Sequence, residues 1–229
     1  MERPGQHTGT HVVTAALQDF GGLMTTLQLD WARNWITRFA ADVERQVDAL
    51  TDLDRLIGDG DFGLNLRSAV RATLAEMEDD PPARPCDVFT RLSDAFLGTG
   101  GTSGPLLGLW FGRIADIRGD EVGVVEFATA VDTATRAVQR LGKAEVGHKT
   151  MVDAMVPARD ALLGAATSGD ITTALAAARD AAVAGAESTR ALLARRGRAS
   201  YVGDHARGVV DPGAHAIAMF FEAANGVDA

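Results

Sequence analysis

Apolar residues recur at every fourth position along the segment that begins at residue 31. An α-helix turns once in about 3.6 residues, so this spacing places the side chains on one face of a helix. The stripe therefore predicts a helix that packs on a core, and it ends before a glycine-rich segment at 58–63. The stripe consists of Trp31, Trp35, Phe39, Val43, Val47 and Leu50.

Helical patterns continue along the rest of the chain. Further helices are predicted at 64–77, 87–97, 106–117, 121–141, 151–166, 171–195 and 214–224. Asp87 precedes Val88 and Phe89, where its carboxylate would cap the third helix. Pro105 stands where a first helical turn can begin. No segment alternates as a half-buried strand does, so we expect an all-α domain of seven or eight helices without strands.

Residues 1–27 are expected to form a flexible or loosely attached extension before a domain at 28–229. Asp19 and the pair Gly21 and Gly22 interrupt the apolar part of this extension, so a signal peptide is not expected. No window approaches the roughly 18 consecutive apolar residues of a membrane span. We therefore expect a cytoplasmic protein without a membrane partner.

The composition is that of a soluble globular domain, with 46% hydrophobic and 23% charged residues. The 229 residues suffice for one domain, or at most two small ones. The net charge is −9 and no basic stripe is present, so a partner bound through nucleic-acid phosphates is not expected. Cys86 is the one cysteine, which excludes an internal disulfide.

The glycine-rich segment at 57–65, IGDGDFGLN, has two interpretations. Its glycines at 58, 60 and 63 fit G-x-G-x-x-G, but that dinucleotide fingerprint must follow a strand, and none is predicted. Its aspartates suggest a hard cation instead, because carboxylates crowded into a short segment repel one another unless a divalent ion binds them. A solvated acidic helix terminus is the alternative. The carboxylates are Asp54, Asp59 and Asp61.

A calcium-binding EF-hand is excluded for this segment. Counted from Asp59 as position 1, the turn position 6 is Leu64 and position 12 is Val70. The glycine and the bidentate glutamate that an EF-hand requires are therefore both missing.

A second glycine-rich loop, GTGGTSGP, occupies residues 98–105. Its backbone N–H groups, with the hydroxyls of Thr99, Thr102 and Ser103, are suited to hold phosphate. A plain connection between two helices is the alternative. The loop is no Walker A motif, because Pro105 follows Gly104 where that motif has lysine.

Isolated basic residues elsewhere are candidate partners of an anion. Taken one at a time, Lys143, Lys149 and Arg198 are interpreted as surface charges. The spacing of His148, His205 and His215 fits no metal-ligand pattern.

Four blocks in a fixed order resemble the nucleotide-binding L subunit of dihydroxyacetone kinase, over residues 28–225. They are LDRLIGDGDFGLN, GGTSGPLLG, GKAEVGHKTMVDAMVPA and GRASYVGDHARGVVDPGA. The resemblance implies an eight-helix antiparallel barrel with the nucleotide site in loops at one end. It also implies a phosphotransferase subunit of the glycerone kinase type in glycerol metabolism.

The resemblance assigns the site residues as well. The three aspartates Asp54, Asp59 and Asp61 would be catalytic, as ligands of two Mg²⁺ ions. ADP or ATP would be contacted by Phe62, Gly63, Leu64, Asn65, Gly101, Thr102, Ser103, Gly142, Met151, Arg198, Asp211, Pro212 and Gly213.

The family also implies partners. A separate K subunit holds the small ketose substrate, and the L subunit is active only with it. In one branch of the family ATP is the donor. In the other, bound ADP is rephosphorylated by a protein of the phosphotransferase system.

Four positions depart from the family pattern: Phe62 replaces histidine, Leu66 methionine, Thr102 alanine, and His148 an acidic residue. Phe62 removes a polar neighbour of the phosphates. Phe62 and His148 motivate the first of two alternatives to the main hypothesis, and the second is a rival from a different functional class. One is a paralogue acting on another short ketose, such as a tetrulose, and the other is a non-catalytic nucleotide-sensing regulatory subunit.

Overall fold

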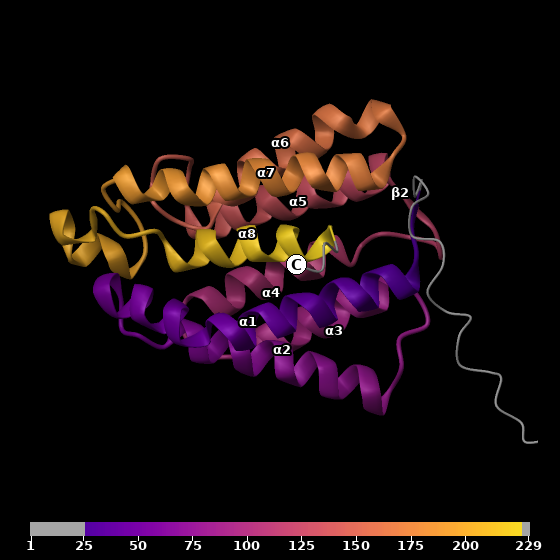
Figure 1. The fold of residues 1–229 in the computed structure, drawn as a ribbon, viewed down its shortest axis with the longest axis horizontal. Coiled ribbons are helices and arrows are strands. Elements are labelled where there is room, and N and C mark those ends of the chain that lie inside the picture. Colours follow the sequence, from indigo (N-terminus) through magenta and orange to yellow (C-terminus); the bar gives the residue numbers. More distant parts are fainter. Residues whose placement is uncertain (1–25, 226–229) are drawn as a thin grey trace, which may run out of the picture.

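The computed structural model describes residues 26–225 and shows a bundle of helices with one very short sheet (Figure 1). The all-α prediction is confirmed. The longest connection lies between α7 and α8 and contains short 3₁₀ turns. The helices are α1 (Leu29–Ile57), α2 (Phe62–Asp79), α3 (Pro85–Leu97), α4 (Ser103–Ile114), α5 (Val124–Gly142), α6 (Val152–Ala165), α7 (Ile171–Ser188) and α8 (Pro212–Ala224).

The sheet consists of two strands of two residues each, β1 (Thr26–Leu27) and β2 (Val122–Gly123), paired antiparallel. The prediction of no strands is wrong to this small extent, because two residues are too few to produce an alternating pattern. Leu27 and Val122 are completely buried, so the end of the predicted extension packs on the domain. The rest of that extension, residues 1–25, lies outside the described residues.

Two helix ends differ from the predictions for identifiable reasons. Helix α3 begins at Pro85, and Asp87 is its third residue rather than its cap. The Asp87 carboxylate instead accepts hydrogen bonds from the backbone N–H groups of Arg84 at 2.9 Å and Ala83 at 3.1 Å. It therefore satisfies the free donors ahead of the helix from inside the first turn.

Helix α7 ends at Ser188, although the alanine-rich pattern predicts helix as far as residue 195. The next residue, Thr189, forms long-range hydrogen bonds: its carbonyl accepts from Lys149 and its hydroxyl from the Asp211 N–H. Tertiary contacts thus override the local helix propensity.

Each helix packs against the next one in the chain, and α8 packs against α1. In Figure 1, α8 lies between α7 and α1. Helices α2, α4, α6 and α8 begin at the same end of the molecule, on the left of Figure 1, and α1 and α5 end there. The expected barrel requires such a closed order, but the barrel itself stays a prediction.

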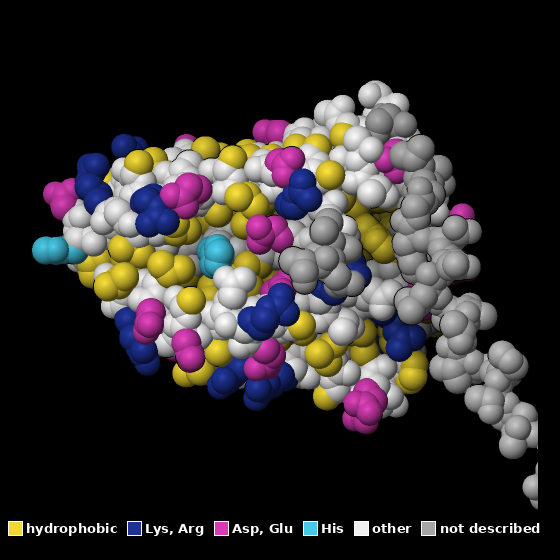
Figure 2. Space-filling model, in the orientation of Figure 1, with side chains coloured by type: hydrophobic (Ala, Val, Ile, Leu, Met, Phe, Trp, Pro, Cys, Tyr) yellow, Lys and Arg dark blue, Asp and Glu magenta, His cyan; other side chains and the backbone are white. Residues whose placement is uncertain are grey.

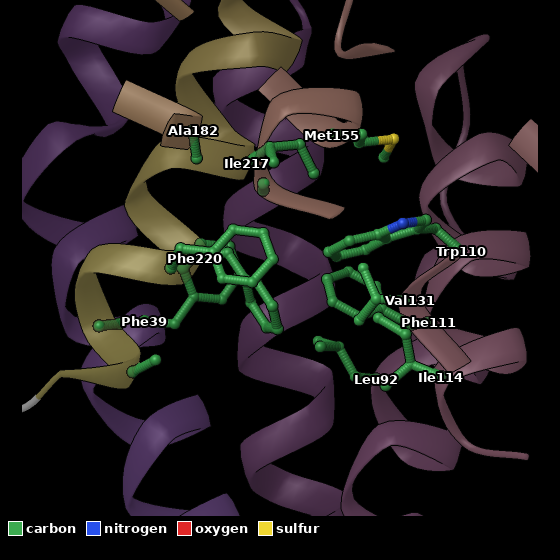
Figure 3. Close-up of a cluster of buried hydrophobic side chains, with 14 of the residues drawn as sticks. Phe39, Leu92, Trp110, Phe111, Ile114, Val131, Met155, Ala182, Ile217 and Phe220 are labelled. Atoms are coloured by element: carbon green, nitrogen blue, oxygen red, sulfur yellow. The ribbon is translucent and has the colours of Figure 1, made fainter. Parts of the chain in front are cut away.

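Aromatic side chains fill the centre of the bundle. The indole N–H of Trp35 donates to the carbonyl of Phe220 at 2.6 Å, and the two rings lie 4.4 Å apart. Trp110 and Phe111 approach Phe220 from α4 (Figure 3). Trp35, Phe39, Val43 and Leu50 of the stripe predicted in α1 thus face this core, with Trp31 at its edge. No described helix has both the length and the apolar character needed to cross a bilayer.

Gly185 permits the closest approach between α6 and α7. A Cβ atom at this position would lie 2.2 Å from the Asp153 carbonyl oxygen, which belongs to the rigid start of α6. We expect Gly185→Ala to lower the free energy of unfolding by about 1–3 kcal/mol through overpacking, as measured by urea denaturation.

The matched control is Gly164→Ala, also within a helix, where an added Cβ would have no neighbour within 4 Å. It should leave stability unchanged or raise it by up to about 1 kcal/mol. Equal effects of the two substitutions would contradict the packing argument.

Candidate functional site

A cavity of about 170 Å³ opens at the end of the bundle where the even-numbered helices begin. The first residues of α2, α4, α6 and α8 all line it. The first N–H groups of a helix lack partners within the helix, and the helix dipole places partial positive charge there. Four such termini meet at this end, which suits an anion, and one of them, that of α8, is already capped by the Asp211 carboxylate.

Three carboxylates stand at one side of the cavity. Asp54 lies in the last turn of α1, and Asp59 and Asp61 lie in the loop before α2. One ligand oxygen from each carboxylate lies within 4.8 Å of the other two. Oxygen ligands at this spacing match the preference of a hard divalent cation such as Mg²⁺.

Two glycines allow these carboxylates to meet. A Cβ at position 58 would lie 2.2 Å from an Asp54 carboxylate oxygen, so only glycine leaves room for that side chain. Gly60 adopts φ +76°, which is costly for other residues. The glycines of this segment therefore serve a turn between two helices, and the element that leads directly into them is α1 rather than a strand.

Asp54 is the least solvent-exposed of the three aspartates. Burial raises the pKa of its carboxyl, and the Asp59 and Asp61 carboxylates raise it as well. The backbone N–H of Phe62 donates to Asp54 at 3.2 Å and acts in the opposite direction. Arg198 forms an ion pair with Asp59 across the cavity mouth. A nearby positive charge thus offsets part of the repulsion among the carboxylates.

The glycine-rich loop before α4 lies next to these carboxylates. A Cβ on Gly101 would lie 3.7 Å from an Asp61 oxygen and 3.3 Å from the Asn65 amide nitrogen. Gly101 has φ +82°, and Thr102 and Ser103 line the cavity. The loop thus brings backbone and hydroxyl donors to the acidic side of the cavity.

Another part of the cavity lining comes from Met151 and the start of α8. Asp211 caps α8, since its carboxylate accepts from the Ala214 N–H at 2.8 Å. Met151 packs closely on Gly213, where an added Cβ would lie 3.3 Å from the Met151 Cβ. Further apolar lining comes from Ile57, Leu106, Val138, Ala144, Val152, Ala199 and Pro212. A flat apolar group such as a purine base would suit this side.

A family model described as the DAK2 domain matches residues 56–226. The chain belongs to the DAK2 domain family. The predicted resemblance to dihydroxyacetone kinase L subunits is thereby confirmed.

Relatives of this DAK2 domain match it over most of its length. The ADP-binding subunit DhaL of PEP-dependent dihydroxyacetone kinase 1 from Listeria innocua is 33% identical over 86% of this chain and 96% of its own. The corresponding DhaL subunit of the PEP-dependent enzyme from Escherichia coli K12 is 33% identical over 82% of this chain and 92% of its own.

Among solved structures, the DAK2 domain resembles the dihydroxyacetone kinase from C. freundii in complex with AMP-PNP and Mg²⁺. The TM-score is 0.66 at 25% identity, over 96% of this chain and 38% of that one.

Most of the residues predicted to contact nucleotide line the large cavity. Four do not. Gly63 packs against α1, where a Cβ would lie 2.5 Å from the Val47 carbonyl oxygen, and Leu64 is exposed. Asn65 lines a separate cavity of about 10 Å³, and Gly101 borders the Asp61 carboxylate. The roles assigned to all these residues by resemblance stay predictions.

For Lys149, the interpretation as a surface charge is wrong. Its side chain is completely buried and still reaches the cavity lining. Part of the apolar lining was also outside the sequence prediction, because its residues come from distant helices and look like ordinary core positions. These unpredicted residues are Ile57, Leu106, Val138, Ala144, Val152 and Ala199. His148, by contrast, is absent from that lining, and its Nδ1 accepts from the Glu145 N–H within its own loop at 3.2 Å.

The carboxyl group of Asp211 is strongly affected by burial. Burial raises its pKa to about 7, against opposing effects of the Ala214 N–H and Lys149. A carboxyl whose pKa is raised on folding stabilises the fold at pH values below its unfolded pKa. That contribution is lost as the pH rises through its folded pKa.

We therefore expect wild-type protein to lose stability relative to Asp211→Asn between pH 4 and 7, with the difference constant above that window. Asparagine is a good helix cap, so the cap is retained. One pKa unit corresponds to about 1.4 kcal/mol, which sets an upper bound of roughly 4 kcal/mol. Urea denaturation across this range measures the difference, and parallel pH profiles would contradict the assignment.

Proposed function

We propose that this DAK2 domain binds a magnesium complex of ADP or ATP and transfers a phosphoryl group to a small ketose held on a separate K subunit. The observation that carries the proposal is the pairing of three clustered carboxylates with four helix N-termini around one cavity. Helix N-termini attract phosphates, whereas the carboxylates repel them unless cations lie between. A metal–phosphate complex satisfies both.

Asp54, Asp59 and Asp61 would hold the magnesium, and we propose two ions as the family resemblance implies. Bound Mg²⁺ would neutralise the charge that develops on the transferred phosphoryl group. The remaining task of the protein is positioning, since phosphoryl transfer needs little covalent chemistry from side chains. Thr102 and Ser103 would hold the phosphates, and Met151, Pro212 and Gly213 would hold the base.

The donor is inferred from the relatives. Two of them are named as ADP-binding subunits of PEP-dependent kinases, and a third as a subunit of a PTS-dependent kinase. These names favour an ADP that stays bound and is rephosphorylated by a phosphotransferase-system protein.

Neither alternative from the sequence gains support. Phe62 is buried in the core and separates the two cavities, and His148 stabilises its own loop. These two departures therefore have local structural roles and do not indicate another ketose. A regulatory subunit would not need the three metal-suited carboxylates together.

We expect Asp61→Asn to abolish the enhancement of ADP binding by Mg²⁺, as measured by calorimetric titration with and without the metal. Changes even to groups that only support metal ligands cost about 10–100-fold in affinity, so loss of a ligand should cost at least that. Helical circular dichroism should not change.

The matched control is Asp52→Asn, an exposed carboxylate two residues before Asp54 in α1 that pairs with Arg55. It should bind Mg·ADP as the wild type does. If the wild-type protein binds ADP equally well with and without Mg²⁺, the proposed function is overturned.

We propose that a partner docks on the surface around the cavity opening, which we call the rim. Of the ten exposed large hydrophobic side chains in the described residues, seven lie at this end. Figure 2 shows hydrophobic side chains at the surface on the left, over the end of α1. Apolar groups gathered on one surface mark interaction sites, and the ketose must be brought to this opening. The rim residues are Leu56, Leu64, Leu97, Leu141, Val146, Leu193 and Tyr201.

We expect the double substitution Leu56→Ser and Tyr201→Ser to lower phosphorylation with the K subunit by about tenfold or more. Tyr201 is 89% exposed, and a tyrosine so placed is a common hot spot of interfaces. Binding of Mg·ADP should be unchanged. Val183→Ser, exposed within α7 away from the rim, is the control, and equal loss in both variants would contradict docking at the rim.

A further inference from the structure

The protein contains only two lysines, and one of them is buried. Lys149 is completely buried and adopts φ +60°, whereas Lys143 is exposed six residues earlier in the same connection. Burial of an ammonium group is unfavourable unless the group is hydrogen-bonded. Burial accordingly lowers the pKa of Lys149. The position therefore needs a physical reason.

The Lys149 ammonium joins two other segments of the chain. It donates to the Thr189 carbonyl at 2.7 Å, directly after α7, and to the Val209 carbonyl, two residues before Asp211. The Thr189 hydroxyl accepts from the Asp211 N–H at 2.9 Å. One side chain and one threonine thus fix the segment that leads into α8.

The backbone around Lys149 is itself held in place. The buried Asp153 carboxylate accepts from the Gly147 N–H at 2.5 Å and the Thr150 N–H at 2.8 Å. The backbone of Lys149 is thus held by its own loop, and its ammonium group is held by the Thr189 and Val209 carbonyls. Met151, two residues on, faces the cavity and packs on Gly213.

The charges around the ammonium do not form a direct ion pair. Asp211 and Asp153 attract it and Arg190 repels it, but no carboxylate of the described residues lies within ion-pair distance. Its direct acceptors are the two carbonyl oxygens. These two bonds occupy two of the three N–H donors of the ammonium, so most of its hydrogen-bonding capacity is used within the fold.

We propose that Lys149 is a positioning residue for the base of the nucleotide, because it locks Met151 against Pro212 and Gly213. We name these three residues the base wall. The proposal rests on the proposed nucleotide binding. It adds that different residues position the base and the phosphates. The base wall depends on Lys149, whereas the phosphate side depends on the aspartates and the loop before α4.

The test compares Lys149→Met with Lys143→Met, the only other lysine. Calorimetry at saturating Mg²⁺ measures the binding of ADP and of pyrophosphate, which has no base. Lys149→Met should weaken ADP binding by about tenfold or more, since hydrogen bonds from charged groups are the stronger ones, and leave pyrophosphate binding within about twofold. Lys143→Met should change neither.

The outcomes separate the two proposals. Wild-type protein that binds neither ligand in a magnesium-dependent manner would overturn the proposed function. Wild-type binding with an unchanged ADP affinity in Lys149→Met would overturn only the positioning role. Equal weakening of both ligands would also overturn it, because that result indicates a general loss of structure.

A second variant covers the case in which Lys149→Met does not fold. Thr189→Val removes the hydroxyl that accepts from Asp211 while it retains the carbonyl that Lys149 binds. We expect the same selective loss of ADP over pyrophosphate, at a smaller size. Thr189→Val with wild-type affinity for both ligands would then overturn the proposal.

Discussion

Repulsion among three carboxylates is the constraint around which one end of this molecule is arranged. One ligand oxygen of each of Asp54, Asp59 and Asp61 lies within 4.8 Å of the others, in a chain whose net charge is already −9. Four helix N-termini face the same cavity and oppose that negative potential. The alternating direction of the helices is what supplies these termini. Architecture and electrostatics are therefore linked: the order of the helices determines which ends meet at the site.

The local parts of this arrangement could be predicted from the sequence. The stripe that begins at Trp31 predicts α1, and the aspartates predict a cation site, because both depend on residues close together in the chain. Helix ends were less predictable where distant groups decide them. Thr189 ends α7 because Lys149 and Asp211 bond to it, and no local pattern reports such contacts.

The same distinction explains which site residues were missed. The acidic side of the cavity comes from one turn between α1 and α2, whereas its apolar lining comes from helices far apart in sequence. Leu106 and Val138 look like core residues in any amphipathic pattern. Lys149 looks like a surface charge in the sequence, because no local pattern indicates that its ammonium group donates to the distant carbonyls of Thr189 and Val209.

The two sides of the site therefore depend on different kinds of contact. The aspartates are held mainly by a short turn whose glycines allow the close approach, with Arg198 and the loop before α4 as the distant contacts. The base wall exists only when α6, the end of α7 and the start of α8 are packed together, with Gly185 and Lys149 at that junction. A defect in this packing should thus disturb the proposed recognition of the base before it disturbs the proposed metal ligands. The physical reason is that short-range geometry survives local loosening better than long-range geometry does.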